Sequence, residues 1–184
     1  MNILEVRRHS MRKSGGGSQL SQAGVDYARA LGATLGPFAC IVTSVVPRTR
    51  ETAIAMGFRV DYEIVTAPED EGIYAELDGA RWWEADQPFV AAAAIIAAQG
   101  STWRYVHKLL AAWRDIMIAL PENTNALFIG HSGELELALV AAFPQADHAQ
   151  WGKPFSHCEG ARLIFAGDPA HFSDVQLLRR GQAG

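Results

Sequence analysis

The chain has 184 residues, of which 49% are hydrophobic and 20% are charged. These values are typical of one globular domain with a buried core, and they argue against a disordered chain or a coiled coil. The formal net charge of −4 disfavours general binding of nucleic acid or of anionic membranes, because both attract basic surfaces.

The chain carries no pattern of a secreted or membrane protein. Cys40 and Cys158 are too few for a disulfide framework or a metal site, and we expect reduced thiols. Residues 1–8 lack the apolar run of a signal peptide. The most apolar stretch, residues 89–98, is shorter than the roughly 20 residues of a membrane span. We therefore expect a soluble cytoplasmic protein with no membrane partner.

Strand-like and helix-like patterns alternate in the first half of the chain. The patterns predict strands over residues 2–8, 38–43 and 59–65, and helices over 22–35 and 47–56. Ser21 is the expected N-cap of the first helix, and Pro47 suits the first turn of the second. Residues 66–86 lack periodicity and contain Pro68, Gly72 and Gly79, which predicts an irregular loop.

The second half continues the alternation. Helices are expected over residues 88–98, 102–120 and 134–142, and strands over 125–130, 161–165 and 175–178. This order predicts an α/β fold: a single domain over residues 1–184 with a mainly parallel central sheet flanked by helices. Residues 66–121 would form a loop and helices that cap the functional site.

Polar side chains follow three of the predicted strands. Arg8 and His9 end the first, Ser44 and then Arg48 follow the second, and His131 follows the strand at 125–130. Ligands in open α/β sheets bind beyond the carboxyl ends of the strands, so we expect these groups to converge. A lone histidine at a strand end is more often structural, and the coincidence of three such ends makes a functional site the better hypothesis.

The converging residue types favour phosphoryl chemistry. Guanidinium groups match phosphate or carboxylate oxygens through paired donors. Imidazole is a nucleophile that is available in its neutral form near neutral pH. A helix that begins just after His131 would also direct free backbone amides to the same edge. Together these features suggest nucleophilic transfer of a phosphoryl group.

Five segments resemble the histidine phosphatase superfamily (phosphoglycerate mutase-like), in the family's order. They are Arg8-His9, Leu20-Ser21-Gln22-Ala23-Gly24, the run from Thr43 to Ala53 with Arg48 on the family's arginine, the segment from Glu71 to Gly79, and Gly130-His131-Ser132-Gly133. The resemblance implies that His9 attacks phosphorus and becomes a phosphohistidine. It implies that Arg8, Arg48, His131 and Ser132 bind the phosphoryl group, and that Glu71 is the general acid, with Glu76 as the alternative.

The sequence departs from the family pattern beside both histidines. Ser10 and Ser132 stand where the family has glycine. Ser10 and Arg12 are candidate substrate contacts, the latter because it lies on a glycine-rich segment just after the nucleophile. None of the departures removes a reacting group.

The resemblance implies a phosphatase that hydrolyses phosphomonoesters without a metal or another cofactor. The expected partner is a small phosphorylated substrate, and the sequence does not indicate an oligomeric state. The alternatives are phosphotransfer of the phosphoglycerate mutase type, a compact phosphatase that acts on phosphohistidine in proteins, and a non-catalytic phosphate-binding regulatory protein.

Overall fold

A six-stranded sheet forms the centre of the protein. The computed structural model describes residues 1–15, 17–167 and 170–180. The strands lie in the order β3-β2-β4-β1-β5-β6. Their bounds are β1 Asn2–Arg8, β2 Cys40–Ser44, β3 Tyr62–Ile64, β4 Asn125–Gly130, β5 Gly160–Gly167 and β6 Ala170–Leu178. The first four are mutually parallel where they pair, and β5 and β6 add an antiparallel edge. The predicted α/β fold is confirmed.

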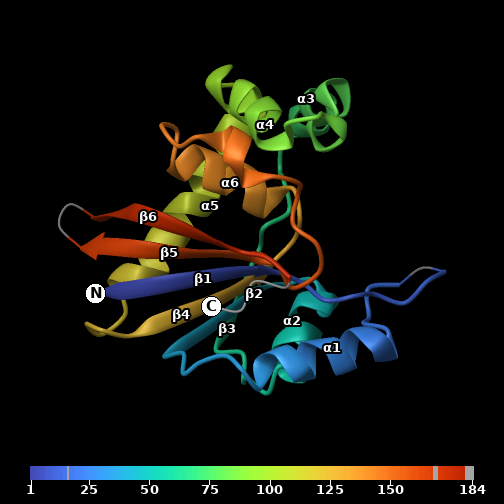
Figure 1. Ribbon diagram of the computed structural model, residues 1–184, viewed down its shortest axis with the longest axis vertical. Coiled ribbons are helices and arrows are strands. Elements are labelled where there is room, and N and C mark those ends of the chain that lie inside the picture. The colour runs from blue at the N-terminus through green and yellow to red at the C-terminus, as the bar shows by residue number, and fades with distance from the viewer. Residues whose placement is uncertain (16, 168–169, 181–184) are drawn as a thin grey trace.

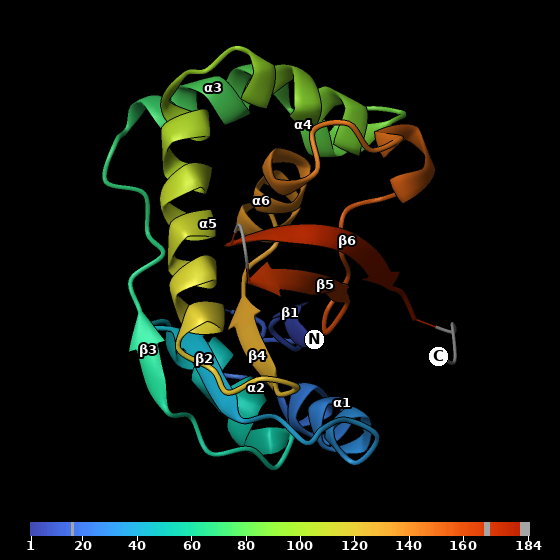
Figure 2. The same cartoon turned by 90° about the vertical axis from the view of Figure 1, so that its left-hand side faces the viewer.

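Helices cover both faces of the sheet, as Figure 1 shows. One face carries α1 (Gln22–Gly32) and α2 (Pro47–Ala55), and the other carries α5 (Ser101–Ile118) and α6 (Glu134–Ala142). Beyond α5 and α6, away from the sheet, lie α3 (Gly72–Ala80) and α4 (Pro88–Ala97), which Figure 2 shows from the side. Short 3₁₀ turns span Trp82–Glu84 and His148–Trp151.

Strand β4 shows why the sheet is covered on both sides. Ala126 and Phe128 belong to the core shared with α5 and α6, whereas Leu127 and Ile129 belong to the core shared with α1 and α2. All four are fully buried, because alternate side chains of a strand point to opposite faces. A run of consecutive apolar residues is therefore typical of a central strand in a parallel sheet.

Segment 66–86 differs from the sequence prediction, since residues 72–80 form α3 and not an irregular loop. The Asp70 carboxylate accepts the Gly72 amide at 2.8 Å at the start of this helix. Ile73 is buried against the rest of the protein. Packing thus overrides the low helix propensity of the two glycines that bracket the segment. The expectation that residues 66–121 cap the site stays a prediction.

Helix α1 begins as the sequence predicts. The Ser21 hydroxyl accepts the Gly24 amide at 3.0 Å, which caps the helix. A side chain at Gly24 would place its Cβ 2.1 Å from the Met11 carbonyl oxygen, so only glycine fits beside the segment that follows His9. Cys40 and Cys158 are free thiols. Across residues 1–15, 17–167 and 170–180, no helix has the length and apolar character needed to cross a membrane.

Candidate active site

The pairing of parallel strands brings the predicted residues to one edge of the sheet. Arg8 pairs with Gly130 between β1 and β4, so the following residues, His9 and His131, lie side by side. Their ring centroids are 5.2 Å apart. Strand β2 pairs with β4 on the other side and ends at Ser44, which contacts His131. The convergence expected from the three strand ends is therefore present.

His9 presents an unprotonated nitrogen. Its Nδ1 lies 2.7 Å from the Ser10 carbonyl oxygen, which only accepts, so Nδ1 carries the proton and Nε2 keeps its lone pair. The side chain is 6% exposed. Burial, with smaller contributions from Arg48, His131 and Arg8, lowers the pKa of His9 to about 3. His9 is thus neutral near pH 7, the form that a nitrogen nucleophile requires.

His131 is held as the opposite tautomer. Arg48 Nη2 donates to its Nδ1 at 3.0 Å, so the ring proton is on Nε2, which donates to Ser44 Oγ at 2.8 Å. Burial, followed by Arg48 and Arg8, lowers the pKa of His131 to about 4. His131 is therefore neutral in this structure, and its one N–H group is bonded to Ser44.

Two guanidinium groups hold donors available at the same edge. Arg8 Nη1 donates to the Phe155 carbonyl oxygen at 2.6 Å, and Arg48 Nη1 to Ser18 Oγ at 3.3 Å. The Nε atoms of Arg8 and Arg48 are buried and have no hydrogen-bond partner among the described residues. Buried donors are rarely left unpaired, so this pair indicates a site for an anion.

The other expected substrate contacts take different positions. Ser10 is fully buried, and its hydroxyl donates to the Gly24 carbonyl oxygen at 2.7 Å. Ser132 donates its hydroxyl to Glu136 at 2.8 Å. Arg12 is exposed, and its charge lowers the pKa of Arg48, after the larger effect of burial, which places it near the anion site. Substrate contacts of Ser10, Ser132 and Arg12 stay predictions.

The two candidate acids are separated by the structure. Glu76 accepts the Ser101 and Thr102 amides at 2.7 and 2.9 Å, so its carboxylate caps α5. The Thr102 side chain and these amides hold the pKa of Glu76 below its usual range. Glu71 precedes α3, where its side chain is exposed and makes no hydrogen bond or ion pair with another described residue. The role of Glu71 as the acid stays a prediction.

Two buried glutamates in the first turn of α6 were not among the site residues predicted from the sequence. Glu136 is fully buried and accepts the Ser132 hydroxyl, the Gly133 amide and the Phe155 amide. It thereby connects the His131 loop to the segment whose carbonyl holds Arg8. Glu134 accepts the His131 amide at 2.6 Å. The signal was two acids alternating with leucines in an otherwise apolar segment.

These carboxylates reduce the number of free amides that the start of α6 offers to an anion. Two of the amides, those of His131 and Gly133, are already bonded to Glu134 and Glu136. The acids satisfy the unpaired donors of the helix from within the first turn. The amides of His131 and Gly133 are therefore not free for an anion, and anion binding at this edge stays a prediction.

A third histidine also lies beside His9. The His157 ring centroid is 5.9 Å from that of His9. Burial, then the charges of Arg8 and Arg180, lower the pKa of His157. No spacing in the sequence indicated this contact, since His157 reaches the site through the turn before β5.

Among the described residues, no group of three His, Cys, Asp or Glu side chains is placed to hold a metal ion.

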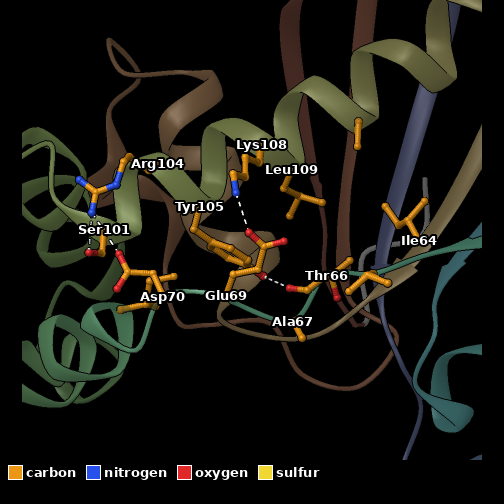
Figure 3. Close-up of a pocket in the computed structure, with 13 residues that line it drawn as sticks. Ile64, Thr66, Ala67, Glu69, Asp70, Ser101, Arg104, Tyr105, Lys108 and Leu109 are labelled. Carbon is orange, nitrogen blue, oxygen red and sulfur yellow. Dashed lines mark hydrogen bonds and ion pairs between the residues drawn. The ribbon is translucent and has the colours of Figure 1, made fainter.

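A separate cavity of about 270 Å³ lies between α5 and the segment that follows β3 (Figure 3). Thr66 and Tyr105 line it, and the Lys108–Glu69 and Arg104–Asp70 ion pairs are at its border. None of the arginines or histidines of the anion site is among its lining residues. The cavity is thus a neighbour of the candidate active site and not part of it.

Comparison with solved structures finds the same fold. A mycobacterial glucosyl-3-phosphoglycerate phosphatase is 19% identical with a TM-score of 0.62, over 96% of this chain and 98% of that one. Phosphoserine phosphatase from Entamoeba histolytica is 15% identical with a TM-score of 0.62, over 98% of each chain. Phosphoglycerate mutase from Bacillus anthracis is 15% identical with a TM-score of 0.62, over 96% of this chain and 92% of that one.

These identities show a shared fold and leave the reaction open. No curated protein matches the sequence. The family model of the histidine phosphatase superfamily (branch 1), in contrast, matches residues 5–176. That range contains both histidines and both arginines of the anion site, and the chain therefore belongs to the histidine phosphatase superfamily.

Proposed function

We propose that the protein is a phosphatase that hydrolyses phosphomonoesters through a phosphohistidine on His9. The observation that carries the proposal is the fixed tautomer of His9. Its Nδ1 proton is held by the Ser10 carbonyl oxygen at 2.7 Å, so the Nε2 lone pair is the reactive one. Burial keeps the ring neutral with a pKa of about 3, beside two arginines with unpaired Nε donors.

The reaction has two steps. In the first, His9 Nε2 attacks phosphorus, the bond between phosphorus and the ester oxygen breaks, and the leaving oxygen takes a proton. In the second, a water oxygen attacks phosphorus and passes its proton to a base, and the phosphorus–nitrogen bond breaks. Inorganic phosphate leaves, and His9 is neutral again. Arg8, Arg48 and His131 supply donors to the equatorial oxygens, where charge is concentrated in the transition state.

The proposed substrate is a small molecule with one phosphomonoester. The formal net charge of −4 disfavours larger polyanions, while the two arginines concentrate positive charge at one point of the sheet edge. Structures with the same fold include phosphatases of glucosyl-3-phosphoglycerate and of phosphoserine, which supports hydrolysis of small esters. Phosphotransfer of the mutase type is the alternative, because a mutase also shares the fold.

The proposal is tested with 4-nitrophenyl phosphate and the His9→Gln variant, without added metal. We expect a loss of phosphate release of about 10³-fold or more, because the nucleophile is removed. His107→Gln is the matched control, since His107 lies on α5 with its Nδ1 on the Trp103 carbonyl oxygen. Wild-type protein quenched during turnover should carry acid-labile phosphate on His9. Equal phosphate release by His9→Gln and wild type would overturn the proposal.

A further inference from the structure

Glu134 joins three parts of the molecule through one buried carboxyl group. It is the first residue of α6 and is 8% exposed. Its Oε1 accepts the His131 amide at 2.6 Å, and its Oε2 lies 3.2 Å from the Tyr105 hydroxyl on α5. The Thr66 side chain, in the segment after β3, also hydrogen-bonds to it. The carboxyl group thus connects an anion-binding histidine to α5 and to that segment.

The hydrogen bonds of the Tyr105 hydroxyl bear on the charge of the Glu134 carboxyl group. The Tyr105 hydroxyl lies 2.7 Å from the Thr66 carbonyl oxygen, a contact that Figure 3 shows. A carbonyl oxygen has no proton to give, so the single phenol proton lies on that bond. The longer contact, 3.2 Å between Tyr105 Oη and Glu134 Oε2, is then a full hydrogen bond only when Glu134 supplies the proton. The geometry therefore accommodates a neutral carboxylic acid at this position.

The surroundings of Glu134 agree with the neutral form. Burial raises its pKa to about 7, which outweighs the lowering effect of the His131 amide. Three titratable neighbours face it. Glu136, on its own helix, disfavours a second negative charge, and Tyr105 stays protonated because burial raises its pKa. His131 is neutral, whereas Arg48 of α2 carries a positive charge that interacts with Glu134.

We propose that Glu134, in its neutral acid form, is a positioning residue that fixes His131. Loss of the Glu134 proton then weakens anion binding at the His9–His131 site. A carboxylate at this place would draw the Tyr105 proton away from Thr66. It would also put a negative charge next to His131 and oppose Arg48 as an anion ligand. The proposal rests on the proposed function only in taking this edge of the sheet as the anion site.

The test uses sulfate as the probe, because its charge is constant over the pH range in which phosphate titrates. Sulfate affinity is measured by titration calorimetry at a series of pH values from about 6 to about 8.5, on both sides of the pKa of Glu134. We expect the wild-type affinity to fall about fivefold to tenfold as pH rises through about 7. His9, His131 and His157 contribute little to this change, since burial lowers all three pKa values.

Glu134→Gln is the matched variant, because its amide keeps an acceptor for the His131 amide and a donor for Tyr105. It should bind sulfate at every pH as the wild type does near pH 6. A wild type without pH dependence, or a variant with the wild-type dependence, would overturn the proposal. Arg48→Ala should lose sulfate binding at all pH values. Sulfate binding retained by this variant would mean that sulfate binds elsewhere, and would also overturn the proposal.

A second variant tests the direction of the Tyr105 hydrogen bond. If Glu134 donates to Tyr105, then Tyr105→Phe removes an acceptor of the neutral form, and the midpoint of the sulfate profile should move to lower pH. A midpoint at higher pH would mean that Tyr105 donates to a carboxylate, which would overturn the assignment. Sulfate binding requires no turnover, so these measurements can refute the role of Glu134 without bearing on catalysis. Full catalytic activity in His9→Gln would instead refute the proposed phosphatase.

Discussion

The carboxyl edge of strands β1, β2 and β4 differs from the segment around α3 in how its polar side chains are held. At the edge, His9 is 6% exposed and His131 is fixed between Arg48 and Ser44. Around α3, Glu71 is exposed, and the Glu69–Lys108 ion pair is exposed as well. The candidate anion site thus lies at a buried, hydrogen-bonded edge, whereas the expected acid is on a solvated segment. Changes at the edge should therefore have the larger effects.

The largest effect is expected for Arg48→Ala. The variant loses a donor to the phosphoryl group and also the donor that fixes the His131 tautomer at 3.0 Å. We expect kcat/KM for an aryl phosphate to fall about 10³-fold, near the upper range for removal of one transition-state donor. Arg50→Ala is the control, because Arg50 is exposed on the same helix and pairs with Glu63. It should change kcat/KM less than about twofold. Similar losses in both variants would show that Arg48 has no specific role.

The second largest effect is expected in the pH dependence of the free energy of unfolding, and it comes from Glu134. Its pKa is about 7 in the folded protein against an ordinary 4.5, so only the folded state holds this proton between those values. Unfolding then releases a proton, and stability falls as pH rises through this window. The contribution is about 3 kcal/mol, from roughly 1.4 kcal/mol per pKa unit.

Urea unfolding of wild type and Glu134→Gln near pH 5 and near pH 8 measures this contribution. The variant should gain about 3 kcal/mol relative to wild type over that change. His9 and His131 have lowered pKa values and act with the opposite sign, since the unfolded chain binds their protons first as pH falls. Wild type and variant both contain these histidines, so the difference between their unfolding free energies isolates the contribution of Glu134. A constant difference between the two proteins would contradict a raised pKa.

A smaller effect is expected for Glu136→Gln. Each Glu136 oxygen accepts at least one hydrogen bond, and the Gln amide nitrogen cannot replace an acceptor. Loss of one or two buried bonds should destabilise the protein by about 2 kcal/mol in urea unfolding. The loss should be smaller in the background of Ser132→Ala, where one donor is already absent. Additive effects of the two changes would show that the hydroxyl and the carboxylate act separately.

The strand ends could be predicted because each depends on local sequence. Residues 125–130 form an apolar run that only a strand covered on both faces explains, and His131 follows directly. Once parallel pairing of the two strands is expected, the topology of the sheet predicts that His9 and His131, which follow them, lie close together at the same edge. Ser21 as the cap of α1 was predictable for the same reason, since the hydroxyl acts on an amide three residues away.

The features that were missed depend on tertiary contacts. Helix α3 contains two glycines, and it is held by Asp70 at its start and by burial of Ile73. The role of Glu76 as the cap of α5 joins residues 25 and 26 positions apart. His157 meets His9 only because the turn before β5 returns to the end of β1. No periodicity or spacing encodes such contacts.

The smallest effect on an aryl phosphate is expected for Glu71→Gln, and this variant tests the solvated segment directly. A nitrophenolate leaves without a proton, so the variant should stay within about twofold of wild type on 4-nitrophenyl phosphate. An alkyl phosphate such as glycerol phosphate needs a proton on its leaving oxygen, and here the loss should be about 10²-fold if Glu71 is the acid.

Glu69→Gln is the matched control for this pair of substrates, because Glu69 lies in the same segment and its carboxylate pairs with Lys108 at 2.9 Å. It should leave both rates unchanged. If Glu71→Gln behaves like Glu69→Gln on the alkyl ester as well, the leaving-group proton comes from the buried edge of the sheet and not from α3. The division of the molecule into a rigid anion site and a separate acid segment would then be wrong, because the edge would supply both.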